Sequence, residues 1–324
     1  MTIFRELLVA ALAAVAGQAA EPLKLESTIP LAGVEGRIDH MAADSSGRRL
    51  FVAALGNNTL EVVDLAAGKR VHSIAGLHEP QGVAYVANRN RVFVASGEDG
   101  KLKVFDGGSL SLIDTVNFLA DADNVRYDPA SHSIVVGYGA GALGVVDATT
   151  GKRTADFPLD GHPESFQLET SGPRIFVNVP TAGHVAVVDR RTHQAAKWPL
   201  SGNQANFPMA LDEAEHRLFV GCRKPPRVAV FNTDTGKIVA TLNCVGDTDD
   251  LFYDTALKRI YVSGGEGFLS VFQQDSNGYH PLAKIPTATG ARTSLFVADL
   301  KRLYLAVPHR GGQSAEVRIY RTQP

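Results

Sequence analysis

Several residue types and motifs with well-known chemistry are rare or missing in this sequence. Among 324 residues there are two cysteines, three methionines and one tryptophan. No Cys-x-x-Cys-His segment occurs, so the chain has no site for covalent attachment of a c-type haem. The HExxH, GxSxG and Walker A patterns are also missing, and with them the signatures of zincin proteases, α/β-hydrolases and P-loop nucleotide-binding proteins.

The chain also lacks an excess of charge of either sign. Lysine and arginine number 32 against 34 aspartate and glutamate, which gives a net charge of −2. Nucleic-acid-binding proteins usually carry a basic stripe that releases counterions, so this balance argues against such a partner. The 31 glycines and 16 prolines are typical of a protein built largely from tight turns.

A long apolar run is missing as well, except for a short one near the N-terminus. Residues 7–17 are apolar and are followed by the small residues of the segment 17–20, a pattern typical of a secretory signal peptide. The run is too short to span a bilayer core of ~30 Å. We therefore predict a signal peptide over residues 1–20 and an exported protein, periplasmic or extracellular, with no membrane span. Residues 21–324 are expected to form a single domain.

One short strand-like segment occurs seven times along the chain. Each copy is a run of three or four apolar residues, and successive copies are 41 to 43 residues apart. They begin at Leu50, Val92, Ile134, Ile175, Leu218, Ile260 and Leu303. A period near 42 with several short strands per repeat is typical of a β-propeller, in which each repeat forms one four-stranded blade. The sequence therefore predicts an all-β, seven-bladed β-propeller, expected to be a monomer.

The two ends of the chain indicate how the ring closes. Each repeat is predicted to contain four strands, A to D, which in the first repeat cover residues 37–43, 50–55, 59–65 and 71–77. The last repeat reaches a C strand at residues 315–320 and has no D strand, whereas residues 23–33, before the first repeat, have the pattern of one. We predict that this N-terminal strand completes the last blade, antiparallel to residues 315–320, and so removes an open sheet edge.

Two conspicuous polar or glycine-rich patterns are interpreted as structural. An acid or amide ends most C strands and is expected to bond the backbone of the following turn: Asp64, Asp106, Asp147, Asp189 and Asn232. Residues 139–144 match the dinucleotide-binding GxGxxG pattern. That motif needs a helix after the glycines, and here a strand follows, so we do not interpret it as a nucleotide site.

The repeat pattern resembles a known family. The segment LFVAALGNNTLEVVDLAAGKRV, residues 50–71, is similar to the YVTN repeat of YncE-like seven-bladed propellers, and the likeness extends over residues 23–320. No blade contains Tyr-Val-Thr-Asn itself; the nearest segment is Ile175-Phe176-Val177-Asn178. The resemblance implies an exported propeller without an obligatory cofactor and does not imply one particular reaction.

Scaffold positions should look alike in all seven blades, so departures from the repeat point to function. The repeats differ most at the start of strand A, which in a propeller lies at the mouth of the central channel together with the B–C loops. Polar groups that converge on a concave opening are typical of a ligand site. The candidate ligand-binding residues are Arg37, Asp39, His40, Glu79, Asp123, Asn124, His162, Glu164, Asn206, Asp249, Asp250, Arg292, His309 and Arg310.

Two functions are compatible with this ring of residues. The favoured one is binding of a small polar ligand, or of a protein or peptide partner, at the channel mouth without catalysis. The alternative is a metal-dependent propeller hydrolase or lyase, similar to the lactonases and streptogramin lyases, that uses a divalent cation. Its metal ligands would be Glu79, Glu164, Asn206 and Asp249, with His40 or His309 as acid–base. The same residues can also form a purely structural network that caps strand ends.

The only two cysteines are expected to pair. Cys222 ends the B strand of the fifth repeat, and Cys244 lies on the connection to the sixth, at the same face. In an exported protein such a pair predicts a disulfide.

Overall fold

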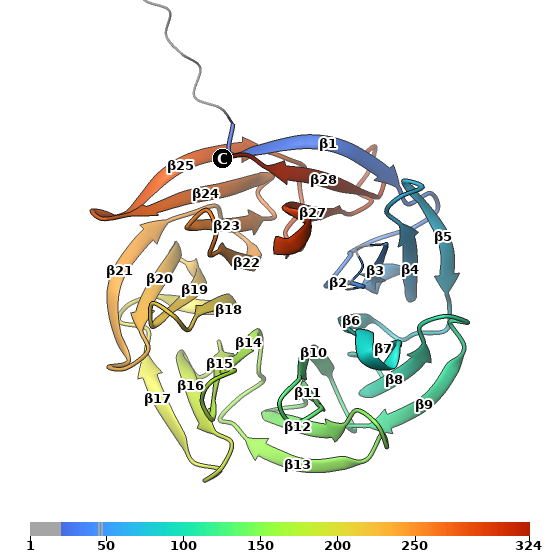
Figure 1. Ribbon diagram of the computed structural model, residues 1–324, viewed down its shortest axis with the longest axis horizontal. Helices are drawn as coiled ribbons and strands as arrows, with labels where there is room; N and C mark the ends of the chain where they lie inside the picture. Colours follow the sequence, from blue (N-terminus) through green and yellow to red (C-terminus); the bar gives the residue numbers. More distant parts are fainter. Residues whose placement is uncertain (1–20, 45, 47) are drawn as a thin grey trace, which may run out of the picture.

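Seven antiparallel sheets of four strands surround a central axis in the computed structural model, which describes residues 21–44, 46 and 48–324 (Figure 1). The fold is therefore the predicted all-β, seven-bladed propeller. The predicted signal peptide, residues 1–20, lies outside the described residues. Within the described part of the chain, no helix is long and apolar enough to cross a membrane.

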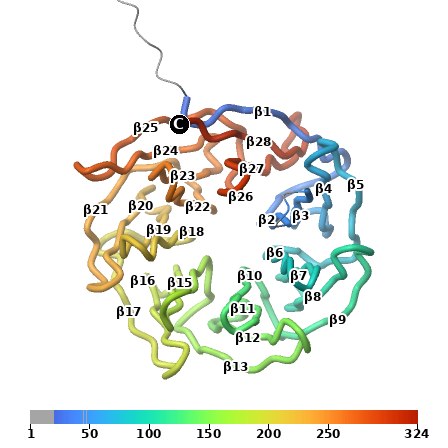
Figure 2. The backbone as a smooth tube through the Cα atoms, viewed as in Figure 1, coloured from blue at the N-terminus to red at the C-terminus, as the bar shows by residue number. Residues whose placement is uncertain are grey.

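The innermost strand of each blade is strand A, and the outermost is strand D (Figure 2). The A strands, in blade order, are β2 (Met41–Ala43), β6 (Pro80–Val86), β10 (Ala122–Asp128), β14 (Phe166–Leu168), β18 (Gln204–Asp212), β22 (Thr248–Asp254) and β26 (Ser294–Val297). The B strands are β3 (Arg49–Ala54), β7 (Arg91–Ser96), β11 (Ser133–Tyr138), β15 (Arg174–Val179), β19 (Arg217–Lys224), β23 (Arg259–Gly264) and β27 (Arg302–Val307).

The two outer strands of each blade follow the same order. The C strands are β4 (Thr59–Asp64), β8 (Lys101–Asp106), β12 (Ala142–Asp147), β16 (His184–Asp189), β20 (Pro226–Asn232), β24 (Phe268–Asp275) and β28 (Glu316–Thr322). The D strands are β5 (Lys69–Ile74), β9 (Leu112–Asn117), β13 (Arg153–Pro158), β17 (Ala195–Pro199), β21 (Lys237–Asn243), β25 (Gly278–Pro286) and, for the seventh blade, β1 (Leu23–Pro30). Three short 3₁₀ turns are η1 (Leu55–Asn57), η2 (Ala87–Arg89) and η3 (Ala298–Leu300).

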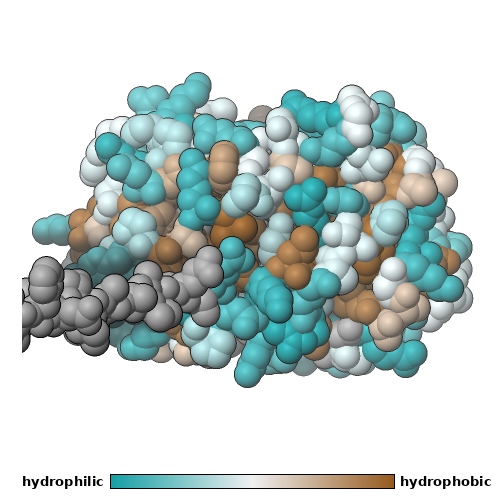
Figure 3. Space-filling model, turned by 90° about the horizontal axis from the view of Figure 1, so that it is seen from above, coloured by the Kyte–Doolittle hydropathy of each residue, from teal (hydrophilic) through white to brown (hydrophobic). Residues whose placement is uncertain are grey.

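The apolar runs of the repeat are buried because each blade has a neighbour on both faces. Successive side chains of a strand point to opposite faces. In β3, Leu50 and Val52 therefore pack between blades 7 and 1, whereas Phe51 and Ala53 pack between blades 1 and 2. The B strands are apolar on both faces for this reason, and the D strands, which form the rim, are half exposed. Figure 3 shows a mostly hydrophilic surface with scattered apolar residues.

The ring closes as predicted. β1 pairs with β28 in antiparallel register from Leu23↔Thr322 to Pro30↔Glu316. The blue β1 and the red β28 accordingly lie side by side in Figure 1. The first blade differs slightly from the prediction, since its A strand covers only Met41–Ala43 and its D strand begins at Lys69. Residues 37–40 run into the mouth of the channel instead of pairing as a regular strand.

The acids and amides after the C strands form the expected turns. Asp106 Oδ1 accepts hydrogen bonds from the backbone N–H groups of Gly108 and Ser109. Those bonds stabilise the carboxylate and lower the pKa of Asp106. Gly139 and Gly141 lie just before strand β12 and Gly144 lies within it, so a strand follows these glycines, as expected.

The expected disulfide is absent: Cys222 and Cys244 are free thiols. Cys222 packs in the cluster between blades 4 and 5, whereas Cys244 packs against the cluster between blades 5 and 6. Cys244 follows the end of β21, and its side chain packs with another cluster than that of Cys222, which spacing along the chain does not reveal. Burial raises the pKa of both thiols to about 12.

Candidate functional site

A polar cavity of about 200 Å³ lies where the A strands begin, and all seven blades contribute to it. Nearly every residue that lines it is charged or can become charged. Its lining consists of Arg37, Asp39, His40, Gln81, Asp121, Asp123, His162, Glu164, Phe207, Arg223, Asp249 and Arg292. We call this cavity the mouth cavity.

Irregular backbone at the start of the A strands aims these side chains inward. Asp121 and Asp247 have positive φ values of 42° and 51° immediately before β10 and β22. The pairing register then shifts between Ala122 and Val125 in blade 3 and between Thr248 and Asp250 in blade 6. Such bulges bend a strand and redirect a side chain that regular alternation would send elsewhere. Asp123 and Asp249, both in shifted segments, reach the mouth cavity in this way.

Three arginines surround Asp249 on one side of the cavity. Arg223 donates to Asp249 Oδ1 at 2.5 Å, and Arg292 Nε lies 3.1 Å from Oδ2. Arg37 lies 3.7 Å from the same oxygen and donates to Asp39 Oδ2 at 2.7 Å. The Arg223 guanidinium also stacks 3.5 Å from the centre of the Phe207 ring. Asp249 is thus the shared anion that holds the arginines of three blades together.

His40 is held between two buried carboxylates. Its Nε2 lies 3.7 Å from Asp39 Oδ1, and its Nδ1 lies 3.5 Å from Asp250 Oδ1. Burial lowers the pKa of His40, but Asp250 and Asp39 outweigh it and raise the pKa to about 10. His40 is therefore an imidazolium at neutral pH and cannot act as a base there.

Asp123, His162 and Glu164 form a compact cluster in the lining of the mouth cavity. One ligand atom from each lies within 4.8 Å of those of the other two. Burial and the nearby Asp123 and Asp249 raise the pKa of Glu164 to about 8. Burial lowers the pKa of His162, but Asp123, the Gly139 carbonyl and Asp121 together raise it to about 9. In the absence of other cations, protons offset the negative charge of this cluster.

The structure brings together most of the predicted residues. Eight of the fourteen line the mouth cavity: Arg37, Asp39, His40, Asp123, His162, Glu164, Asp249 and Arg292. Asp250 lines a second cavity of about 310 Å³, which shares His40 with the mouth cavity. His309 and Arg310 line an adjoining cavity, described below.

Three predicted residues do not reach the mouth cavity. Glu79 is exposed, and its backbone N–H donates to Asn58 Oδ1. Asn124 is buried at 1% exposure and is not part of the cavity lining. Asn206 is fully buried and donates to Asn178 Oδ1 and the His184 carbonyl, so it joins two blades. The four metal ligands of the hydrolase alternative, two of which are Glu79 and Asn206, are therefore not assembled.

Four lining residues were not among the candidates: Gln81, Asp121, Phe207 and Arg223. Gln81 and Asp121 form a hydrogen bond between blades 2 and 3. Gln81, Asp121 and Phe207 lie in the same variable segments as the predicted residues, and Arg223 lies at the end of strand β19. A comparison of these segments that ignored strict alternation would have found the first three.

A basic cavity of about 320 Å³ adjoins the mouth cavity and shares Arg37 and Arg292 with it. Its other charged residues are Asp247, His309 and Arg310. Asp247 is paired with Arg292 at 2.9 Å, and His309 contacts Glu35 at 2.7 Å. The exposed Arg310 has no ion pair among the described residues. This cavity therefore offers an uncompensated guanidinium next to the mouth cavity.

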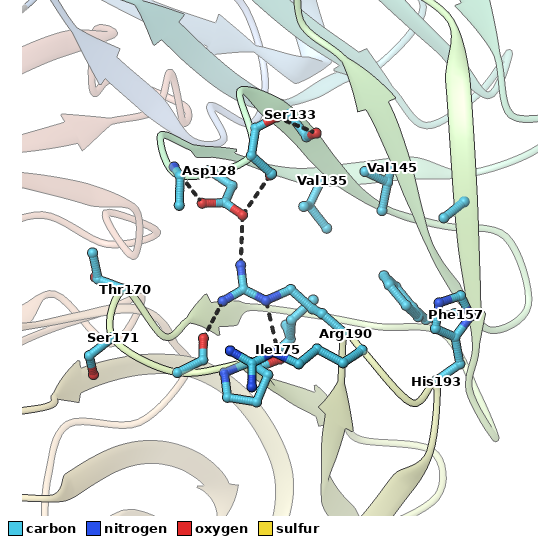
Figure 4. Close-up of a pocket in the computed structure, with 16 residues that line it drawn as sticks. Asp128, Ser133, Val135, Val145, Phe157, Thr170, Ser171, Ile175, Arg190 and His193 are labelled. Atoms are coloured by element: carbon cyan, nitrogen blue, oxygen red, sulfur yellow. Dashed lines mark hydrogen bonds and ion pairs between the residues drawn. The ribbon is translucent and has the colours of Figure 1, made fainter.

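A further cavity of about 450 Å³ lies between blades 3 and 4, and its origin is structural (Figure 4). In six blades strand B begins with arginine and has phenylalanine or tyrosine two residues later, as in Arg49 and Phe51. Blade 3 has Ser133 and Val135 at these positions and leaves the space open. Arg190 of blade 4 supplies the missing guanidinium, at 2.6 Å from Asp128.

Comparison with known proteins supports the fold and the expected resemblance. No family model matches the chain. It is 22% identical over 261 residues to a curated relative named uncharacterized protein YncE, from Salmonella typhimurium. The match covers 80% of this chain and 62% of the relative, so the chain spans less than two thirds of that protein's length. Together with the seven-bladed ring, this match confirms the likeness to YncE-like propellers.

Solved structures with the same fold come from unrelated settings. A chain of a mitotic checkpoint complex matches with a TM-score of 0.80 at 16% identity, covering 100% of this chain and 99% of that one. The WD40 repeats of RRP9 match with a TM-score of 0.78 at 12% identity, covering 94% of this chain and 98% of that one. Hydrazine synthase of Kuenenia stuttgartiensis matches with a TM-score of 0.75 at 15% identity, covering 90% of this chain and 97% of that one. At these identities the likeness extends to the fold alone, and function has to be argued from the site.

Proposed function

We propose that the protein binds a small polar ligand that carries an acidic group, with that group in the basic cavity and the remainder of the ligand in the mouth cavity. The observation that carries the proposal is the convergence of charged side chains from all seven blades on one cavity. Positions that serve the scaffold, such as the arginine that begins strand B, recur in six of the seven blades. The residues of the mouth cavity, by contrast, differ from blade to blade, as Asp123, Glu164 and Arg292 illustrate.

The acidic group is inferred from the arginines. Arg37 lines both cavities, and its side chain is 43% exposed, so it can bind a ligand without losing its contact with Asp39. Arg310 has no anionic partner in the described chain and lies beside it. Guanidinium groups bind carboxylate and phosphate groups with paired, charge-assisted hydrogen bonds. An acid is therefore the group that this pair of arginines fits best.

Binding is favoured over hydrolysis by the state of the candidate catalytic groups. His40 is held as an imidazolium between two carboxylates, and His309 contacts Glu35 on the surface. Neither is positioned as a free base near the mouth cavity. The four-ligand metal set of a lactonase-like enzyme is not brought together, as described above.

The proposal is tested with thermal shift and calorimetric titration of the full chain, stripped of metal ions with a chelator that is then removed by dialysis into metal-free buffer. Inorganic phosphate, succinate and glutamate serve as acidic probes, and glucose serves as a neutral one. We expect at least one acidic probe to bind and glucose not to bind. Arg310→Gln and Arg37→Gln should each weaken binding by about tenfold or more, as expected for a charge-assisted hydrogen bond.

Arg227→Gln is the matched control, because Arg227 lies on the outer part of blade 5 and bonds only Asn243. It should bind the probes as the unaltered protein does. Failure of all three acids to bind, equal binding of glucose, or full binding by Arg310→Gln would contradict the proposal.

We also propose that residues 1–20 are a cleaved export signal and that residues 21–324 act as one domain outside the cytoplasm. The support is the short apolar run at residues 7–17, followed by small residues. N-terminal sequencing of the protein from a periplasmic fraction should give a start at Ala20 or Glu21. Recovery of the uncleaved chain from the cytoplasm would contradict export.

A further inference from the structure

We propose that Asp123, His162 and Glu164 form a binding site for one divalent transition-metal ion, with Zn²⁺ as the best match. The site lies in the mouth cavity and joins blades 3 and 4. It uses other residues than the four considered for a lactonase-like enzyme, apart from Glu164.

The spacing of the three side chains fits a single ion. Their ligand atoms lie within 4.8 Å of one another. Around a tetrahedral ion with bonds of ~2.0–2.2 Å, ligand atoms are about 3.4 Å apart. Side-chain movements of about 1 Å therefore bring all three onto one ion, without a change in the backbone. The fourth position would face the cavity.

The carboxyl groups of the buried Asp123 and the half-buried Glu164 accept no hydrogen bonds from the described residues. Asp123 is only 6% exposed, and within the described part of the chain no donor forms a hydrogen bond to its carboxylate. Its nearest cationic atom is His162 Nε2, at 3.7 Å. The side chain of Glu164 likewise receives no hydrogen bond from the described residues, since only its backbone N–H is bonded. A buried carboxylate without donors is costly unless a cation binds it.

His162 is oriented as a metal ligand would be. Its Nδ1 lies 2.6 Å from the Gly139 carbonyl. A carbonyl can only accept, so Nδ1 carries the proton and donates. Nε2 faces Asp123 at 3.7 Å and is the ring nitrogen that would exchange its proton for a metal ion. Histidines that bind metals usually donate their other ring nitrogen to a carbonyl or carboxylate in this manner, which fixes the tautomer and the ring.

The ligand set selects the kind of ion. Ca²⁺ takes six to eight oxygen ligands, and Mg²⁺ prefers oxygen and keeps several waters. One imidazole and two carboxylates suit Zn²⁺ better, and three protein ligands with an open position are typical of sites that bind a further molecule. The proposal goes beyond the binding of an acid at the arginines, because an ion here would accept an oxygen atom of the same ligand.

The test is calorimetric titration of the metal-stripped full chain with Zn²⁺, with Ca²⁺ and Mg²⁺ as comparisons. We expect one Zn²⁺ per chain and weaker binding of the other two ions. His162→Ala, Glu164→Gln and Asp123→Asn should each lower the affinity for Zn²⁺ by more than about a hundredfold. That is beyond the roughly 10–100-fold loss typical of a residue that only supports a ligand.

Two further variants make the result specific. Asp121→Asn removes a carboxylate 3.3 Å from His162 Nδ1 and should weaken binding by no more than about a hundredfold. His309→Ala removes a histidine outside the cluster and should change nothing. Thermal unfolding of each variant checks that it is folded. If His162→Ala does not fold, Glu164→Gln replaces it as the decisive variant, because glutamine has nearly the same shape as glutamate.

The proposal is overturned if the stripped protein binds no stoichiometric Zn²⁺, if Glu164→Gln binds Zn²⁺ like the unaltered protein, or if Ca²⁺ binds more tightly. Because the acidic probes are measured on the metal-stripped protein in metal-free buffer, their binding does not depend on this outcome. The two proposals can therefore fail separately.

Discussion

Ring closure by the N-terminal strand leads to a quantitative prediction about Ile29. This residue of β1 is 1% exposed and packs with Val317 in the cluster that joins blades 7 and 1. Replacing a fully buried isoleucine by alanine usually costs about 2–5 kcal/mol, from lost burial and the cavity left behind. Against a typical total stability of about 5–15 kcal/mol, Ile29→Ala should therefore remove a large part of the free energy of unfolding.

Leu25 of the same strand provides the matched control. It is 48% exposed, so Leu25→Ala should change the free energy of unfolding by less than about 0.5 kcal/mol. Both variants are compared with the unaltered chain by equilibrium unfolding in urea, followed by tryptophan fluorescence. Equal effects of the two substitutions, or an Ile29→Ala effect below about 0.5 kcal/mol, would refute the argument that β1 is an integral strand of the seventh blade.

Four further predictions concern single residues elsewhere. Burial raises the pKa of Glu213, but hydrogen bonds from the Ser171 hydroxyl and from the backbone N–H groups of Thr170 and Ser171 outweigh it and lower the pKa from 4.5 to about 2. Glu213→Gln should therefore cost about 1 kcal/mol at pH 7. In urea titrations the difference should be complete above pH 4.5 and vanish as the pH falls towards 2. Val135→Phe should fill the cavity between blades 3 and 4 and raise the unfolding free energy by about 0.5–2 kcal/mol. An unfolding free energy below that of the unaltered protein would contradict the account of that cavity. Denatured, unreduced protein should show two thiols with Ellman's reagent, from Cys222 and Cys244. Detection of no thiol would mean that the two cysteines form the disulfide after all. Gly144→Ala should cost about 1–3 kcal/mol, since its Cβ would lie 2.3 Å from a Phe118 ring atom; an unchanged stability would contradict this.

The fold could be predicted almost completely because a propeller repeats its pattern. Seven copies of one buried B strand give seven blades, and the surplus strand at the N-terminus is the one that the last repeat lacks. The first blade was predicted less well: residues 37–40 look like part of a strand, but they run into the mouth cavity. Contacts with other blades determine their path, and these do not appear in the local sequence.

The site was predicted in part, for reasons that depend on geometry. Asp123 and Glu164 were found because they break the repeat at a position that faces the channel. Asn206 breaks it too, but its side chain bonds a neighbouring blade. Cys222 and Cys244 are close along the chain and at the same end of a blade, yet their side chains pack with different clusters. Side-chain direction at bulges and strand ends decides each case, and sequence alternation predicts it poorly.

The measurement that tests the central claim most directly is the free energy of unfolding of Glu164→Gln, set beside that of Phe219→Ala. If the charged ring is a binding site, its residues are not arranged for stability, and removing a buried carboxylate without hydrogen bonds should leave the unfolding free energy within about 1 kcal/mol or raise it. Phe219 is fully buried, so Phe219→Ala should cost about 3–5 kcal/mol. A loss in Glu164→Gln as large as that in Phe219→Ala would mean that the ring is structural and would contradict the proposed function.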